Sequence, residues 1–175
     1  MASIKITLFA LLFLAIFTYS KATLSPLKET EITLYYKISA GGPNATVIEV
    51  PGPSIGPLNF TRFGATFVSD TLITEEIEEF SAPVARGRRF FVIAALDGSQ
   101  SLWVDSVVFI NGKYKGSTLQ LQGSYSFMEL SEMAVVGGTG KFRRASGYAT
   151  FETVYFDPVR SYAVLQSNLT VLHYV

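Results

Sequence analysis

The chain has 175 residues, no cysteine, one histidine and equal numbers of acidic and basic side chains, so its formal net charge is zero. This composition excludes thiolate chemistry and cysteine-based metal sites. A single histidine also argues against a zinc site, which usually needs several histidine or cysteine ligands. It also lacks the positive charge that nucleic-acid binding needs. We therefore expect one domain with its own core, no cofactor, no metal and no nucleic-acid partner.

The first 22 residues are predicted to be a secretory signal peptide, followed by a single domain over residues 23–175. Lys5 precedes an almost wholly apolar run over residues 6–17, and small or polar residues follow up to Ala22. The run is too short to cross a bilayer, which takes about 20 residues. A membrane anchor is the alternative interpretation.

Three glycosylation sequons agree with a secretory route. They stand at Asn44, Asn59 and Asn168, each followed by a threonine two residues later. A sequon is used only on an exposed position of a secreted protein. We expect an extracellular glycoprotein with no membrane contact after cleavage.

Period-2 alternation predicts strands through most of the remaining chain. In the first, Leu34, Tyr36 and Ile38 alternate with polar residues. A loop rich in Gly and Pro is expected over residues 41–57, and an acidic, solvated loop over residues 71–83. The predicted strands cover residues 31–38, 62–69, 89–96, 102–110, 116–122, 133–136, 148–155 and 161–174.

Turn signals separate the later strands and complete the pattern of an all-β domain. They are Asp97-Gly98, Asn111-Gly112, Gly137-Gly138 and Asp157-Pro158. About eight strands without an amphipathic helix indicate a barrel or a sandwich. The chain also has 14 Phe and 9 Tyr, which either line a pocket for a flat ligand or simply fill an aromatic core.

Four segments in chain order resemble the plant dirigent family. They are FGATFVSD at 63–70, KGSTLQLQG at 115–123, VVGGTGKF at 135–142 and LTVLHY at 169–174. The resemblance implies an all-β fold, an eight-stranded antiparallel barrel of the dirigent and allene oxide cyclase type. It also implies a homotrimer secreted to the apoplast, with a dimer as the alternative.

The resemblance implies a function in phenylpropanoid metabolism. Family members guide the coupling of phenoxy radicals from monolignol-type phenols in lignan biosynthesis, and a separate laccase or peroxidase supplies the radicals. Such a guiding protein performs no oxidation itself. Two alternatives stay open: an enzyme that closes a ring or removes water through a quinone methide, and a non-catalytic defence protein of the cell wall.

The chain departs from the family pattern at the residues that carry its chemistry. Lys37 and Ile38 stand where the first strand of relatives has His and Asp, and Lys141 replaces an Asp after GGTG. Ser146 replaces an Arg, and only Arg86 remains from the GRAQG segment. Because Ile38 and Lys141 cannot act as carboxylates, we expect either a different coupling or lost chemistry.

Asp105 is the candidate replacement for the missing carboxylates. It lies in an apolar strand and shares a face with Trp103 and Val107. Inside the barrel, burial would raise its pKa and suit it to acid/base catalysis together with Tyr36. On the outside it would instead pair with a lysine or an arginine.

Further substrate contacts are hypotheses with structural alternatives. Asp70 is expected in a loop or at the rim, and Arg144 in a basic turn that is either solvated or substrate-binding. His173 falls on the face opposite Asn168, where a purely structural role is the alternative. The predicted contacts with phenolic ligands are Tyr36, Asp70, Arg86, Phe91, Trp103, Arg144 and His173.

Overall fold

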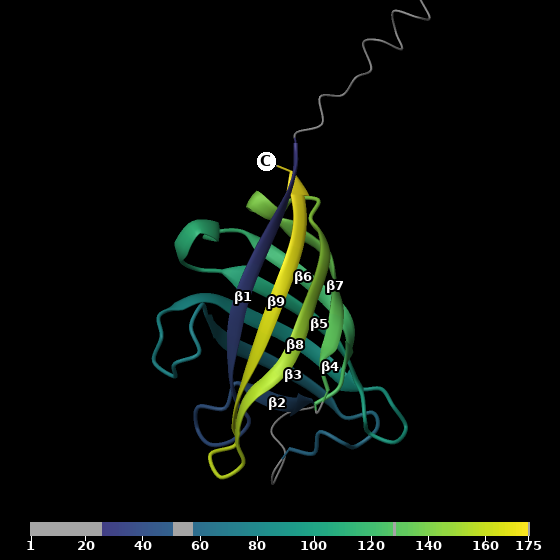
Figure 1. Ribbon diagram of the computed structural model, residues 1–175. Coiled ribbons are helices and arrows are strands. Elements are labelled where there is room, and N and C mark those ends of the chain that lie inside the picture. Colours follow the sequence, from purple (N-terminus) through teal and green to yellow (C-terminus); the bar gives the residue numbers. More distant parts are fainter. Residues whose placement is uncertain (1–25, 51–57, 128, 175) are drawn as a thin grey trace, which may run out of the picture.

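A computed structural model describes residues 26–50, 58–127 and 129–174. The predicted signal peptide, residues 1–22, lies outside these ranges and stays a prediction. Within them, no helix has the length and apolar character needed to cross a membrane. The regular structure of the described residues is β apart from two 3₁₀ turns, Gly112–Tyr114 (η1) and Gly140–Phe142 (η2) (Figure 1).

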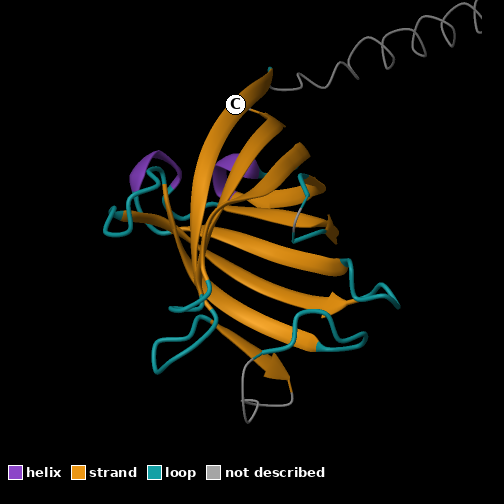
Figure 2. Cartoon of the chain, turned by 60° about the horizontal axis from the view of Figure 1, so that its bottom comes forward, coloured by secondary structure: helices purple, strands orange, loops and turns teal. Residues whose placement is uncertain are grey.

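In the part of the chain that the structure describes, nine strands form one antiparallel sheet that closes on itself. Their order is β1-β9-β8-β7-β6-β5-β4-β3-β2, and β1 also pairs with β3. β1 and β3 to β9 thus make the predicted eight-stranded antiparallel barrel, and β2 extends the sheet outside it (Figure 2). The strands are β1 Leu27–Ser39, β2 Val47–Val50, β3 Thr66–Thr74, β4 Pro83–Ile93, β5 Ser101–Phe109, β6 Thr118–Tyr125, β7 Ser131–Thr139, β8 Ser146–Asp157 and β9 Tyr162–Tyr174.

The alternation predicted from the sequence builds the barrel interior. In β5, Trp103, Asp105 and Val107 are buried, whereas Leu102 and Val104, on either side of Trp103, are exposed. Because successive side chains of a strand point to opposite faces, each strand gives every second residue to the core. Burial of one large apolar side chain stabilises the fold by about 1.5–3 kcal/mol, so these positions hold the barrel together.

Several predicted boundaries are wrong. β2 lies within the loop predicted for residues 41–57, β3 continues to Thr74, and β4 starts at Pro83 rather than at residue 89. Gly137 and Gly138 lie in β7, and the turn comes at Gly140, whose φ is 61°. The sequence pattern does not indicate these strand ends, because their outward-facing residues are polar and only the inner face of a barrel must be apolar.

The two ends of the barrel differ in their contents. At the terminal end, where Leu27 pairs with Tyr174, the rings of Phe109, Tyr114, Phe142 and His173 pack together. At the opposite end, here called the far end, the strands next to the β4–β5 and β6–β7 connections carry a second set of aromatic residues, which includes Phe91, Trp103 and Tyr125. The terminal end is therefore closed by its own side chains.

The three sequon asparagines are exposed, as glycosylation requires. Asn44 and Asn59 lie in the connections before β3, and Asn168 lies on the outer face of β9. His173 is buried, which places it on the face opposite Asn168, as the alternation predicts. Use of the sequons stays a prediction.

Candidate functional site

Three strands bring a buried polar cluster into the middle of the barrel. The alternation of β1 turns Tyr36 inward, and the same alternation places Arg89 of β4 and Asp105 of β5 inside. Arg89 and Asp105 are direct partners in the β4–β5 register, and Arg89 Nη2 donates to Asp105 Oδ2 over 2.9 Å. The two side chains are 3% and 0% exposed, so this is a buried ion pair.

Aromatic rings surround the Arg89 guanidinium. Its Cζ lies 3.7 Å from the ring centroid of Trp103 and 5.0 Å from that of Tyr36. A cation over the face of an aromatic ring is attracted by the ring quadrupole, most strongly where water is excluded. Asp105 and the two rings therefore hold Arg89 in one orientation.

Each member of this cluster keeps one polar atom without a hydrogen-bond partner. The atoms are Tyr36 Oη, Arg89 Nε and Asp105 Oδ1, and all three are buried. Buried polar atoms are nearly always hydrogen-bonded, because an unmade bond costs about 1–3 kcal/mol. Three such atoms in one cluster are the feature expected of a site that receives a polar ligand.

Tyr36 is a neutral phenol at ordinary pH. Burial raises its pKa well above the usual value, the negative charge of Asp105 raises it further, and Arg89 partly offsets both. The three groups thus act on one another electrostatically, although Tyr36 Oη makes no hydrogen bond of ordinary geometry. In this state the hydroxyl is able to donate a hydrogen bond or a proton to a ligand oxygen.

A row of aromatic rings runs from the far end of the barrel to this cluster. Phe60, which is 37% exposed, lies 4.9 Å from Phe67, which stacks at 4.9 Å on Phe91. Phe91 contacts Trp103 at 5.6 Å, and Trp103 stacks on Tyr125 at 3.9 Å between centroids. Flat rings stack favourably on such surfaces, so the row suits an aromatic ligand.

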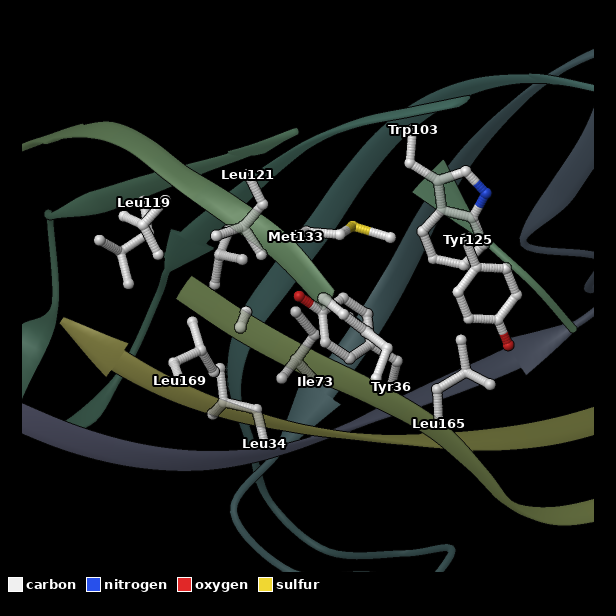
Figure 3. Close-up of a cluster of buried hydrophobic side chains, with 14 of the residues drawn as sticks. Leu34, Tyr36, Ile73, Trp103, Leu119, Leu121, Tyr125, Met133, Leu165 and Leu169 are labelled. Atoms are coloured by element: carbon white, nitrogen blue, oxygen red, sulfur yellow. The ribbon is translucent and has the colours of Figure 1, made fainter. Parts of the chain in front are cut away.

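Figure 3 shows Tyr36 between a group of leucine side chains and a group of aromatic side chains inside the barrel. Its ring is flanked on one side by Leu34, Leu119, Leu121 and Leu169, and on the other by Trp103 and Tyr125. These four leucines lie toward the terminal end of the barrel, whereas Leu165 and the aromatic row lie toward the far end. The polar cluster therefore stands where the aromatic half ends.

Four of the predicted site residues meet inside the barrel. Tyr36 and Asp105 belong to the polar cluster, and Phe91 and Trp103 belong to the aromatic row. Asp105 also pairs with an arginine, an arrangement that the sequence predicts for an outward-facing Asp105. Here both partners are inside.

The other predicted contacts lie away from the cluster. Asp70 stands in the body of β3, not in a loop, and its carboxylate pairs with Arg86 on the outer face at 2.7 Å. Arg144 is exposed at the terminal end. His173 is buried there, with its Nε2 3.0 Å from Thr30 Oγ1 and its ring against Phe142. The structure gives these four residues no contact with the polar cluster.

Arg89 is the site residue that the sequence analysis missed. It lies in the run Arg86-Gly87-Arg88-Arg89, whose first and third residues face outward. One signal was available, because Arg89 stands two residues before Phe91 and so shares its face. A carboxylate that stays charged inside a barrel is normally paired with a cation.

Gly87 provides the space that Tyr36 occupies. A Cβ at this position would lie 2.8 Å from Tyr36 Cε1 and 3.2 Å from Ile73 Cδ1. We expect Gly87→Ala to destabilise the barrel by about 1–3 kcal/mol, because the Tyr36 ring or the strand must shift to accept a methyl group at this contact. Urea denaturation followed by circular dichroism measures the change.

Gly137→Ala is the matched control for Gly87→Ala. A Cβ at Gly137, in β7, meets no atom within 4 Å. Its effect is expected to stay within about 0.5 kcal/mol. Equal stability of the two variants would contradict the close packing of Gly87 against Tyr36.

The sequence and the fold agree with one known family. A family model described as Dirigent-like protein matches residues 29–172. The chain belongs to the dirigent family. Dirigent protein 23 of Arabidopsis thaliana is 33% identical to it over 147 residues, which cover 83% of this chain and 79% of the relative. Pterocarpan synthase 1 of Glycyrrhiza echinata is 29% identical over 149 residues, covering 84% and 79%.

Solved dirigent structures share the architecture. The pterocarpan synthase dirigent protein GePTS1 has a TM-score of 0.79 at 27% identity, covering 86% of this chain and 93% of that chain. The pterocarpan synthase dirigent protein PsPTS1 has a TM-score of 0.76 at 28% identity, covering 85% of this chain and 97% of that chain. The likeness extends over almost the whole length of both structures.

In this dirigent barrel the interior carboxylate comes from β5. Ile38 and Lys141, at the positions where the family resemblance implies carboxylates, supply none, and the Lys141 ammonium instead donates to the carbonyl of Lys113 over 2.7 Å. Among the residues that the structure describes, Asp105 is the one fully buried acidic side chain. Asp105 and Tyr36 are therefore the candidate acid/base groups of the polar cluster.

Proposed function

We propose that this dirigent protein holds phenolic intermediates in its barrel and sets the regio- and stereochemistry with which they couple. The observation that supports the proposal is the cluster of Tyr36, Arg89 and Asp105 at the inner end of an aromatic row. The cluster offers unpartnered polar atoms to ligand oxygens, and the row offers stacking surfaces to ligand rings.

In the proposed coupling, the protein positions the phenolic radicals and does not oxidise the phenols itself. A separate laccase or peroxidase removes one electron and one proton from each phenol. Two of the resulting radicals then form one new bond while the barrel holds them in a fixed relative orientation. Fixed orientation favours one product because only nearby, aligned atoms react. Arg89 Nε and Tyr36 Oη bind a ligand oxygen, and Asp105 Oδ1 accepts from a ligand hydroxyl.

Incubation with coniferyl and p-coumaryl alcohols tests the proposal. Purified protein is assayed with and without laccase, and the products are separated by chiral chromatography. We expect one enantiomer in excess when protein and laccase are both present, and no product without the oxidant. Racemic product in every arm would contradict the proposal and would favour the non-catalytic cell-wall protein instead.

A second candidate is ring closure through a quinone methide. It is favoured by the acid/base pair of Asp105 and Tyr36 and by relatives that are named pterocarpan synthases. In this step a ligand hydroxyl gives its proton to Asp105 as its oxygen bonds to the methide carbon. The quinone oxygen takes a proton from Tyr36, and proton transfer from Asp105 to Tyr36 restores both groups. Product formed from a quinone methide without oxidant would favour this candidate.

We also propose that the protein acts outside the cell, as a glycoprotein that associates with copies of itself. The signal-like first residues and the exposed sequons support secretion to the apoplast. Ile48, Val68, Phe90 and Val104 are direct neighbours across β2 to β5, and three of these four are more than 40% exposed. A continuous apolar row on an outer surface favours self-association, such as the predicted trimer.

A further inference from the structure

The buried cluster has no net charge. Arg89 contributes one positive charge, Asp105 one negative charge, and Tyr36 is neutral because its pKa is raised. The three unpartnered atoms are a donor, an acceptor and a hydroxyl that serves as either. An uncharged ligand with hydroxyl and ether or carbonyl oxygens satisfies all of them.

No other charged group inside the described barrel changes this balance. The remaining buried basic side chains are Lys37 and His173. Lys37 lies outside the barrel wall, where its ammonium donates to the carbonyls of Glu76 and Ile77. His173 belongs to the ring cluster at the terminal end. A ligand at the Tyr36 cluster therefore meets the field of the Arg89–Asp105 pair alone.

We propose that the Arg89–Asp105 pair is a charge filter that admits uncharged phenolic alcohols and esters and rejects phenolic carboxylates. The inference rests on the proposed function, because it assumes that the barrel holds phenolics. It assigns substrate selection to a pair of residues rather than to the shape of the barrel.

The filter follows from the cost of burying charge. A carboxylate that enters the cluster loses its hydration, and Arg89 cannot compensate it because Asp105 already neutralises that cation. The cluster would then hold two anions and one cation away from water. An alcohol of the same shape brings no charge and gains the same hydrogen bonds.

Trp103 provides a direct probe of this site. It is the one tryptophan of the chain, and it contacts both Arg89 and Tyr125. A ligand that reaches the cluster is expected to quench its fluorescence, after correction for absorption by the ligand. Three ligands that differ only at the end of the side chain make the comparison: coniferyl alcohol, methyl ferulate and ferulate, all at pH 7.

We expect the alcohol and the ester to bind at least about tenfold more tightly than the acid, which corresponds to one decade of Kd. Asp105→Asn leaves Arg89 unpaired and the cluster positive, so its preference should reverse toward ferulate. Ferulate should also raise the melting temperature of this variant, because a ligand that binds only the folded state stabilises it. Asp70→Asn, which breaks the outer pair with Arg86, is the control and should keep the original preference.

The outcomes separate the filter from the proposed function. Equal affinity for the three ligands overturns the filter and leaves the proposed function standing. No binding of any ligand overturns the proposed function and the filter with it. If Asp105→Asn folds and still prefers the alcohol, the pair does not select. If that variant does not fold, the comparison of the three ligands on the unaltered chain decides.

Discussion

Asp105→Asn is expected to lower the free energy of unfolding by about 3–5 kcal/mol, the usual effect of removing one partner from a buried ion pair. The change leaves the Arg89 guanidinium without a counter-charge at a position where its side chain is only 3% exposed. We also expect loss of product selectivity, because the interior then has no carboxylate. Urea denaturation followed by circular dichroism measures the stability of the variant, and chiral chromatography measures its selectivity.

Asp70→Asn is the matched control for stability as well. Asp70 pairs with Arg86 over 2.7 Å, much as Asp105 pairs with Arg89, but on the solvent side of the sheet. Breaking an exposed pair changes stability by about 1 kcal/mol or less. The same loss of stability in both variants would show that burial does not distinguish the two pairs.

Tyr36→Phe is expected to separate stability from function. The hydroxyl of Tyr36 is buried without a partner, so its removal should leave the free energy of unfolding unchanged or raise it by about 1 kcal/mol. Activity should fall about 100-fold if the hydroxyl transfers a proton, as typical general acids contribute at least this much. Retained stability with lost activity is the combination expected when the hydrogen-bond partner of a buried polar group is the ligand.

Tyr162→Phe is the control for Tyr36→Phe. The Tyr162 hydroxyl is also buried without a partner, but Tyr162 lies on the outer face of β9. Its removal should change neither stability nor activity. If Tyr36→Phe keeps full activity in the coupling and ring-closure assays, Tyr36 has no part in the chemistry.

The sequence alone determined the family and the all-β barrel, and it named two of the three residues of the polar cluster, Tyr36 and Asp105, as candidates. Four motifs in chain order indicated the family, and period-2 alternation grouped Asp105 with Trp103 on one face and put Tyr36 on the apolar face of the first strand. The structure shows that both faces are inward. This placement succeeds because alternation is a local property of a strand. Whichever strands later pair, every second residue of β5 faces the same side.

Only the tertiary structure decided which charged side chains form ion pairs. Arg86, Arg88 and Arg89 stand within four residues, yet one pairs with Asp105 inside and the others lie near Asp70 outside. That choice depends on where β4 begins and on its register with β3 and β5, and registers join segments far apart in the sequence. For the same reason β2, which exists only by pairing with β3, was not predicted.

The sequence also showed what the site lacks, whereas the fold showed what replaces it. Ile38 and Lys141 could be identified as non-acidic from single positions. That Asp105 becomes the buried carboxylate, with Arg89 as its partner and Tyr36 beside it, follows from the closure of the barrel by β1 and β3. Closure pairs β1 with β3, and it removes water from the side chains inside the barrel. Burial then gives these groups electrostatic interactions that an open, solvated sheet would not provide.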